Sequence, residues 1–347
     1  MHFRNLTFIG MAGVVLGLLA GAAIAQPSPA KPAQAETKTW TPPRTADGRP
    51  DLQGVWANNN ATPLERPKEL AGRPYLTEQE VAALKRKAHE LFDGGNSDAA
   101  FGDSVFVSVL QNVKGEKAGF QSVDGGTGDY SSVWLVERNF DNRTSLITDP
   151  PDGRLPALTP EGQKRQAATA AVRNSRPEGP EDRSLSERCI TFGAPRLGAG
   201  YNSYYQIVQS ADSVAIEMET IHDVRMIPLD TRPHLPSTMR SWLGDSRGHW
   251  EGDTLVVDTT NYKAGAFMNA SEKLHVTERF TRTGPETLKY EVTIDDPATW
   301  TKPWSVVIPL SHSRDAVFEY ACHEGNLGMT GILAGARAEE KAERTAK

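Results

Sequence analysis

The chain has 347 residues and a formal net charge of −6 at pH 7. A chain of this length can form one large domain or two small ones. Lys and Arg do not gather in any one stretch, which argues against nucleic acid or an anionic membrane surface as a partner.

The first 25 residues have the pattern of a cleavable export signal. Arg4 precedes a weakly polar to apolar run at residues 6–19, and Ala25 completes a small-x-small cleavage site. The run is short for an uncleaved membrane anchor, which is the alternative interpretation, and no later stretch approaches about 18 apolar residues. We therefore expect a soluble periplasmic or secreted protein with no membrane span after cleavage. In such an oxidising compartment Cys189 and Cys322 are expected to form one disulfide bond.

The segment after the signal is predicted to wrap a core. Residues 26–38 have the composition of a flexible leader, and residues 41–67 are rich in proline, which favours extended backbone over helix. Within this stretch, Gly54 and Trp56 form a G-x-W motif, which is typical of the first strand of lipocalin-type barrels.

Two helices are predicted in this wrapping segment, which spans residues 39–184. Residues 77–80 form a capping box, apolar residues follow at helical spacing, and two glycines end the helix at 94–95. The next stretch, residues 94–132, is rich in Gly, Asp and Ser and is expected to be a long irregular connection. The second helix begins with a proline at residue 160 and ends near residue 174.

Repeated hairpins predict a β domain over residues 185–330. Alternating apolar and polar residues, separated by short turns, are typical of antiparallel strands. The expected strands lie at residues 204–209, 214–227, 249–250, 254–260, 274–282, 287–295, 305–310 and 316–322. Seven or eight such strands favour a mainly β fold, either an antiparallel lipocalin-like β-barrel or a strongly curved meander. The charged tail at residues 331–347 is expected to be a solvated helix or disordered.

His222 and Glu278 are the candidate catalytic residues. If residues 214–227 form one strand, period-2 counting places His222 on its apolar face, and the same counting places Glu278 on the apolar face of the strand at 274–282. A buried His and a buried carboxylate could transfer protons in one cavity. The alternative is structural: a His bonded to a backbone carbonyl, and a Glu paired with an inward Arg.

The link between the predicted strands at 214–227 and 249–250 is crowded with charged and aromatic residues. Prolines and tryptophans among the charges favour an ordered loop over the barrel mouth rather than a solvated one. The candidate substrate-binding residues in this link, for an anionic or oxygenated small molecule, are Arg232, His234, Arg240, Trp242 and Arg247.

Two apparent motifs carry less weight. Ser246 lies in a G-x-S-x-G sequence, but the strand-then-helix context of a nucleophile elbow is missing, so Ser246 is interpreted as a turn residue. No compact ligand motif is present, so no metal and no other cofactor are expected. A metal site assembled from separate loops by His222, His234 and His323 is the alternative.

Three sequence blocks, DGRPDLQGVW, RPHLPSTMRSWLGDSRGHWEGDTLVV and YACHEGN, resemble a large family of uncharacterised exported (periplasmic) bacterial proteins. The resemblance covers nearly all of the chain after the signal and implies export.

We expect an exported enzyme that acts on a small organic molecule by acid–base chemistry in a barrel pocket, as a lyase, isomerase or hydrolase. The alternative is a non-catalytic periplasmic protein that binds a small molecule in the same pocket. A third interpretation is an envelope protein whose charged loops contact another protein. Substrate, reaction and oligomeric state are left open.

Overall fold

The computed structural model describes residues 40–92, 104–115, 138–199 and 202–346. All described residues belong to one compact unit, Trp40–Lys347. The predicted signal peptide at 1–25 and leader at 26–38 therefore lie outside the described residues.

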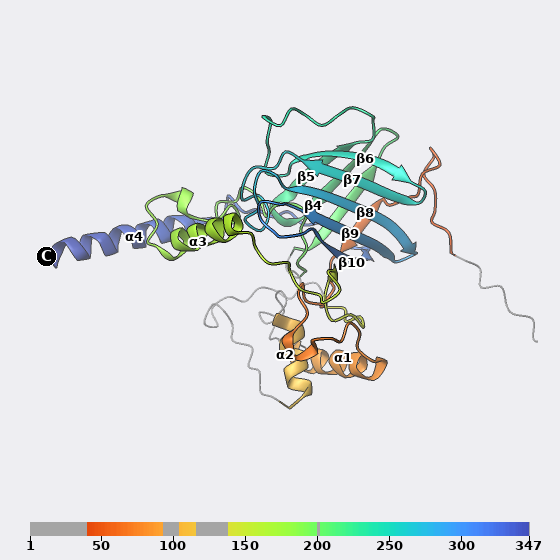
Figure 1. Ribbon diagram of the computed structural model, residues 1–347, viewed down its shortest axis with the longest axis horizontal. Coiled ribbons are helices and arrows are strands. Elements are labelled where there is room, and N and C mark those ends of the chain that lie inside the picture. Colours follow the sequence, from red (N-terminus) through yellow and green to blue (C-terminus); the bar gives the residue numbers. More distant parts are fainter. Residues whose placement is uncertain (1–39, 93–103, 116–137, 200–201, 347) are drawn as a thin grey trace, which may run out of the picture. The chain divides into compact units, whose positions relative to one another are not determined.

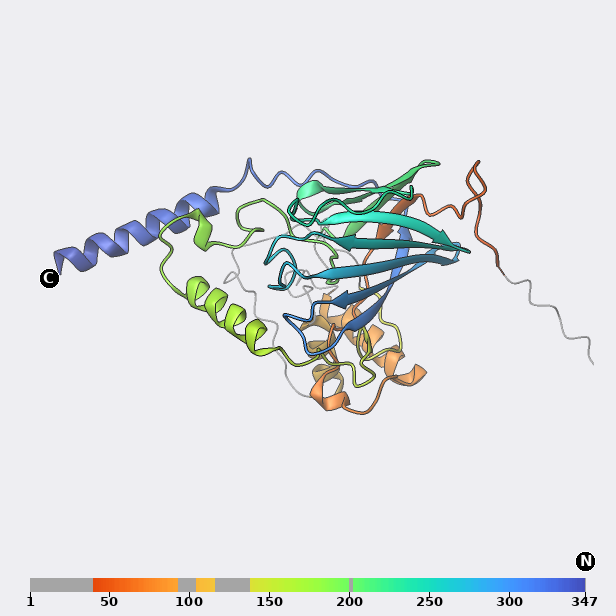
Figure 2. The ribbon, with the colours of Figure 1, turned by 45° about the horizontal axis from the view of Figure 1, so that its top comes forward.

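Nine strands form a nearly closed antiparallel barrel, consistent with a lipocalin-like fold (Figures 1 and 2). Their order around the barrel is β5-β4-β3-β1-β10-β9-β8-β7-β6, and β2 (Ile147–Asp149) pairs with β10 beside this path. The nine strands are β1 (Gly54–Ala57), β3 (Tyr204–Gln209), β4 (Ser213–Met218), β5 (Asp223–Pro228), β6 (Asp245–Glu251), β7 (Thr254–Thr260), β8 (His275–Gly284), β9 (Thr287–Asp295) and β10 (Trp304–Ser313). The prediction of a mainly β barrel is confirmed.

Alternate residues of these strands point inward and form the core. Phe280 stacks on Tyr290 with ring centroids 4.5 Å apart, and Tyr205 packs edge-on against Tyr290 at 6.3 Å. Fully burying one such aliphatic or aromatic side chain contributes about 1.5–3 kcal/mol. The interior of the barrel is thus filled largely by packed side chains, and the pocket described below opens between two strands.

The predicted single strand at residues 214–227 is wrong. The chain turns back at a 3₁₀ turn, η5 (Thr220–His222), in which Ile221 has a φ of 58°, so that β4 and β5 pair antiparallel. The turn shifts the alternation: in β5, Arg225 and Ile227 are buried, whereas Val224 and Met226 are 48% and 61% exposed. Period-2 counting across the turn therefore assigned β5 to the wrong faces.

The barrel receives a strand from the segment that was expected only to wrap it. β1 lies between β3 and β10, with Val55 opposite both Gln206 and Ser313. Trp56 of the G-x-W motif is fully buried, and its indole Nε1 donates to the Leu52 carbonyl at 2.8 Å. The barrel thus combines β1 with strands from residues 204 to 313.

In the described part of the stretch between β1 and β3 there are three α-helices, rather than two. The predicted helices are α1 (Glu78–Phe92) and α3 (Pro160–Asn174), and the additional one is α2 (Ser104–Val113), in the stretch expected to be irregular. Phe106 and Val109 of α2 are buried in one cluster with Leu84 of α1 and with Phe140. This burial supports helix in a sequence of moderate helix propensity.

The last predicted strand is wrong, because residues 316–322 are irregular. α4 (Leu327–Thr345) follows, so the helical alternative for the charged tail is confirmed. The predicted disulfide between Cys189 and Cys322 is present and joins the segment before β3 to the segment before α4. Among the described residues, none of the helices combines the length and apolarity needed to cross a bilayer.

β5 and β6 are the two ends of the sheet, and they meet at a seam. In the described part of the chain, no backbone ladder pairs them. At Gly248 of β6, a built Cβ would lie 2.8 Å from Ile227 Cγ2 and 2.8 Å from Leu229 Cδ2. The missing side chain therefore lets the end of β5 pack against β6 and close one end of the seam.

Candidate functional site

Arg225 and Glu278 form a buried ion pair across this seam. Arg225 on β5 is 5% exposed and Glu278 on β8 is 0% exposed. Arg225 Nη1 donates to Glu278 Oε1 at 2.9 Å, and Nη2 donates to Oε2. Oε1 also accepts a hydrogen bond of 2.6 Å from the Tyr290 hydroxyl. Both carboxylate oxygens are thus engaged, as a stable buried charge requires.

Two hydroxyls extend this pair to the strands between. Arg225 Nη2 donates to Ser246 Oγ on β6 and to Thr259 Oγ1 on β7, each at 3.2 Å, and these two hydroxyls are 2.9 Å apart. The Arg225 side chain therefore connects β5 to β6, β7 and β8. These side-chain hydrogen bonds replace the backbone ladder that the seam lacks.

The surroundings of Arg225 and of the nearby tyrosines shift the pKa values of these side chains. Burial lowers the pKa of Arg225, but the charge and hydrogen bonds of Glu278 raise it by more, so the net shift is upward. Burial, and then the negative charge of Glu278, raise the pKa of Tyr290. Burial also raises the pKa of Tyr205 to about 12. Arg225 therefore stays charged, and both tyrosines stay neutral hydroxyl donors.

A cavity of about 380 Å³, here called the seam pocket, lies between β5 and β6 at the end of the seam away from Gly248. It is lined by Ile190, Thr191, Asp223, Val224, Arg225, Met226, Ser241, Trp242, Leu243, Gly244, Asp245 and Ser246. Trp242 and Met226 give it an aromatic and aliphatic wall. Arg225 Nε is buried and has no hydrogen-bond partner among the described residues. The seam pocket thus combines apolar surface with the buried guanidinium of Arg225 in its wall.

The two candidate catalytic residues have different outcomes. Glu278 faces the barrel interior, as predicted, and its neighbour is the inward Arg that the structural alternative named. The inward position of His222 depended on a strand that ends at Met218, and the His222 side chain lies outside the described residues. Proton transfer by this pair stays a prediction.

The candidate substrate-binding residues lie mainly outside the barrel. His234 contacts Asp245 and Asp258, which point outward because their neighbours Ser246 and Thr259 point inward. The link between β5 and β6 therefore lies against the outer face of β6 and β7, and the predicted position over the barrel mouth is wrong.

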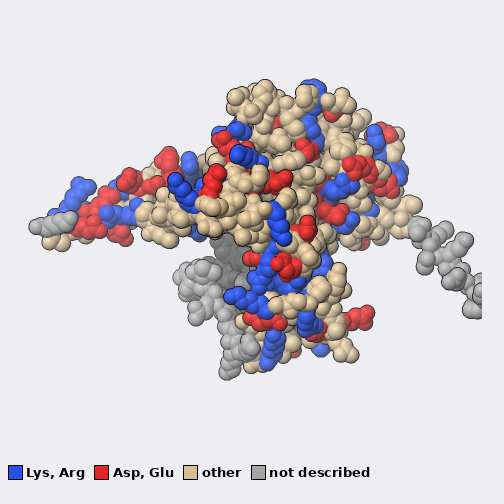
Figure 3. Space-filling model, in the orientation of Figure 1, with Lys and Arg blue, Asp and Glu red and all other residues tan. Residues whose placement is uncertain are grey.

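Acidic neighbours neutralise most charges of this link. Arg232 pairs with Asp230, Arg240 pairs with Glu272 at 3.1 Å, and Arg247 pairs with Asp245 at 3.1 Å. Acidic and basic side chains are interspersed in the same way over the face drawn in Figure 3. Of the five predicted binding residues, only Trp242 lines the seam pocket, and Lys263 Nζ lies 4.9 Å from its ring centroid.

Two histidines and two aspartates form a chain of hydrogen bonds on this outer face. His234 Nδ1 is 2.8 Å from Asp245 Oδ2, His234 Nε2 is 2.8 Å from Asp258 Oδ1, and His275 Nε2 is 2.5 Å from Asp258 Oδ2. Both ring nitrogens of His234 thus lie within hydrogen-bond distance of a carboxylate, so His234 links Asp245 to Asp258. The hydrogen bond from His275 lowers the pKa of Asp258, and the same bond raises the pKa of His275.

A metal centre is not formed by the described side chains. No group of three or more His, Cys, Asp or Glu among them is arranged to hold an ion. Of the three histidines in the alternative metal site, His234 is engaged with two carboxylates, His323 is exposed, and the His222 side chain is not described.

Comparisons of the chain with family models, with curated proteins and with solved structures find no match. The resemblance noted from the sequence blocks stays a prediction.

Arg225 and Ser246 are the site residues that sequence reasoning missed. Counting residues 214–227 as one strand puts Arg225 on its polar face, and the turn at Thr220–His222 has no Gly or Pro to signal the interruption. Ser246 was interpreted as a turn residue, but it lies in β6 and is 7% exposed. Glu278 was the signal in the sequence that could have identified Arg225. A carboxylate on an apolar face needs a partner, and a buried cation such as Arg225 is one that can supply it.

Proposed function

We propose that this protein binds a small, neutral organic molecule in the seam pocket and that it acts outside the cytoplasm, as a periplasmic or secreted protein. The molecule has an apolar or aromatic body and one exposed carbonyl oxygen. The observation that carries this proposal is the buried guanidinium of Arg225 on the pocket wall, with its Nε lacking an acceptor. The disulfide bond is compatible with an oxidising compartment.

The apolar body is argued from the wall of the pocket. Trp242, Val224 and Met226 line it, and the last two are largely exposed. Exposed apolar side chains around a concave surface are typical of small-molecule sites. An aromatic ring against Trp242 would gain about 0.5–1.5 kcal/mol beyond the area that it buries.

The neutral carbonyl is argued from the charges of the lining. The positive charge of Arg225 is already balanced by Glu278, and the Asp245 carboxylate on the wall is paired with Arg247. A ligand carboxylate would therefore find no unbalanced cation at Arg225, whereas a neutral carbonyl needs only a hydrogen-bond donor there.

Binding is preferred to acid–base catalysis because Glu278, the candidate catalytic carboxylate inside the barrel, is fully engaged. A general base must lie within hydrogen-bond reach of the proton that it removes and must be able to accept it. Both oxygens of Glu278 already accept from Arg225 and Tyr290. In this proposal Glu278 positions Arg225 and contacts no ligand.

The test is calorimetric titration with three matched probes: benzamide, benzoate and benzylamine. Benzamide is expected to bind most tightly, and Trp242→Ala is expected to weaken it about tenfold, which corresponds to about 1.4 kcal/mol. Val208→Ala is the control, because Val208 is exposed on β3 and does not line the pocket. Equal affinity for the three probes, or no effect of Trp242→Ala, would contradict the proposal.

A further inference from the structure

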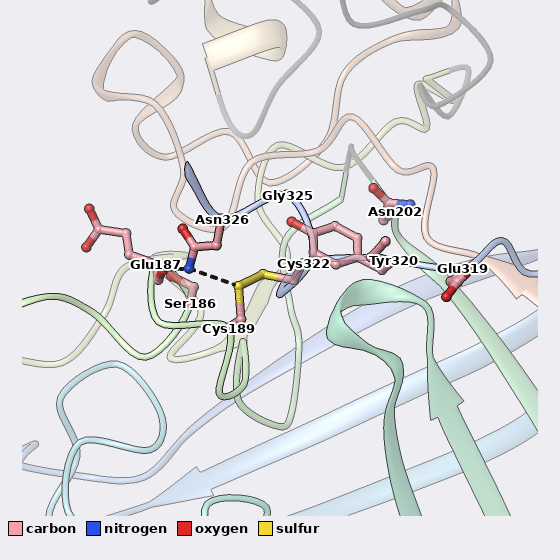
Figure 4. A pocket seen from close by; sticks show the side chains of 10 residues that line it. Ser186, Glu187, Cys189, Asn202, Glu319, Tyr320, Cys322, Gly325 and Asn326 are labelled. Carbon is pink, nitrogen blue, oxygen red and sulfur yellow. Dashed lines mark hydrogen bonds between the residues drawn. A yellow bond between two sulfur atoms is a disulfide. The ribbon is translucent and has the colours of Figure 1, made fainter. Parts of the chain in front are cut away.

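A second cavity, of about 570 Å³, lies beside the disulfide bond, separate from the seam pocket. Figure 4 shows the side chains that line it, contributed by the segment before β3 and by the segment between β10 and α4. Asn202, Glu319 and Tyr320 lie on its wall together with the disulfide itself. We call it the disulfide pocket.

Covalent and hydrogen bonds hold two sides of the disulfide pocket together. Cys189 and Cys322 are bonded, and Asn326 Nδ2 donates to the Glu187 carbonyl at 2.9 Å and to Cys189 Sγ at 3.3 Å (Figure 4). Glu187 itself accepts from Arg183 and from Ser184. The wall is therefore pre-organised, which lowers the entropy lost when a ligand binds.

The disulfide pocket has hydrogen-bond acceptors that lack donors. Asn202 is 3% exposed, and its side-chain Oδ1 has no hydrogen-bond partner among the described residues. A buried acceptor without a donor costs about 1–3 kcal/mol, so the pocket has a place for an N–H or O–H group. Glu319 on the same wall is exposed and forms no ion pair with a Lys or Arg in the described ranges.

The surroundings of Asn202 add a further acceptor. Glu219 is 1% exposed, its Oε1 accepts from the Phe318 amide at 3.1 Å, and its Oε2 has no hydrogen-bond partner among the described residues. Burial raises the pKa of Glu219 above its ordinary value, and the hydrogen bonds of Phe318 and Asn202 offset only part of that rise. Arg196, the cation near Glu219, donates to Thr220 and stacks on the Phe192 ring at 5.1 Å, and it does not line the pocket.

We propose that the disulfide pocket binds a primary ammonium group of a small aliphatic amine, between Asn202 Oδ1 and the Glu319 carboxylate, with the Tyr320 ring alongside. An ammonium has three donors and no acceptor, which matches a wall of unpaired acceptors. It also gains from the carboxylate and from an aromatic face. This site is independent of the proposed function of the seam pocket.

The test is titration of the full exported chain, with its disulfide intact, by isothermal calorimetry. The probe is 1,4-diaminobutane, and 1,4-butanediol and succinate are controls of the same length. The diamine is expected to bind, and the diol and the diacid are not. Trp242→Ala, which changes the seam pocket, is expected to leave diamine binding unchanged, so failure of one site is distinguishable from failure of the other.

Matched variants test the two acceptors. Glu319→Gln is expected to weaken diamine binding by about two- to fivefold, the effect of a partly exposed ion pair. Asn202→Gly removes the amide acceptor, tolerates the φ of 47° at this position and is expected to weaken binding by a similar factor. Glu324→Gln is the control, because Glu324 is exposed and does not line the pocket. Diamine and diol binding equally, no heat at millimolar diamine, or an equal effect of Glu319→Gln and Glu324→Gln would overturn the proposal.

Discussion

Breaking the Arg225–Glu278 pair from one side is expected to destabilise the barrel severely. Arg225→Met leaves the fully buried Glu278 with a single donor, Tyr290. Removing one partner of a buried ion pair typically costs about 3–5 kcal/mol. A domain of ordinary stability has about 5–15 kcal/mol in total, so this single change removes a large share of it.

Removing both charges together is expected to cost much less. In Arg225→Met with Glu278→Leu neither charge of the pair remains, and the main loss is the acceptor of the Tyr290 hydroxyl, about 1–3 kcal/mol. Adding Tyr290→Phe removes that unpaired hydroxyl and is expected to recover part of the loss. The three variants thus separate the cost of an isolated charge from the worth of the pair.

The assay is equilibrium unfolding in urea under non-reducing conditions, with the m-value checked in each variant. The expected result is a double variant more stable than Arg225→Met alone. The reasoning is refuted if the double variant loses as much unfolding free energy as Arg225→Met and Glu278→Leu, measured as separate variants, lose in sum. It is also refuted if Arg225→Met costs less than about 1 kcal/mol, the range of an exposed pair.

Three further outcomes are expected. Gly248→Ala should destabilise the fold by about 1–3 kcal/mol in urea unfolding. Gly284→Ala is the control and should change stability far less, because a Cβ there meets nothing closer than 3.8 Å. Equal effects of the two changes would contradict closure of the seam at Gly248. Replacing both cysteines by Ser removes a cross-link of 133 residues and should lower the unfolding free energy by about 4–5 kcal/mol in the loop-entropy model; an unchanged urea midpoint would contradict it. The Asp258–His275 bond raises the pKa of His275 above 6.5 and lowers the pKa of Asp258 below 3.8. Its contribution to the unfolding free energy is therefore complete between about pH 4 and pH 6.5. That contribution is lost as pH rises through the His275 pKa, and it is also lost as pH falls through the Asp258 pKa. His275→Gln should remove this part of the pH dependence of the urea midpoint, and an identical pH profile in both proteins would argue against the bond.

Sequence patterns predicted the hairpins well because alternation is a local property. β3, β7 and β9 (Tyr204–Gln209, Thr254–Thr260 and Thr287–Asp295) begin and end as predicted, since turns with Gly, Asp, Ser or Pro separate them. The capping box at Thr77 is also present, with Thr77 N donating to Glu80 Oε2 at 2.8 Å.

The candidate site was harder to predict because it depends on one turn and on non-local pairing. The 3₁₀ turn at Thr220–His222 interrupts apolar alternation without Gly or Pro, so counting placed Arg225 outside the barrel. The seam between β5 and β6 is not encoded locally either, because it arises where the sheet curves back on itself. The burial of Glu278, which needs only its own strand, was predicted correctly.

The position of β1 has a consequence for how the chain folds. Only four residues long, β1 pairs with β3 on one side and with β10 on the other, and it precedes β10 by more than half of the chain. Contacts of such large sequence separation form slowly. Until β1 is inserted, the edge of β3 and the part of β10 around Ser311–Ser313 that face it are unpaired and can add strands from other chains. A short segment thereby protects the folding chain from aggregation, and loss of β1 would expose both edges.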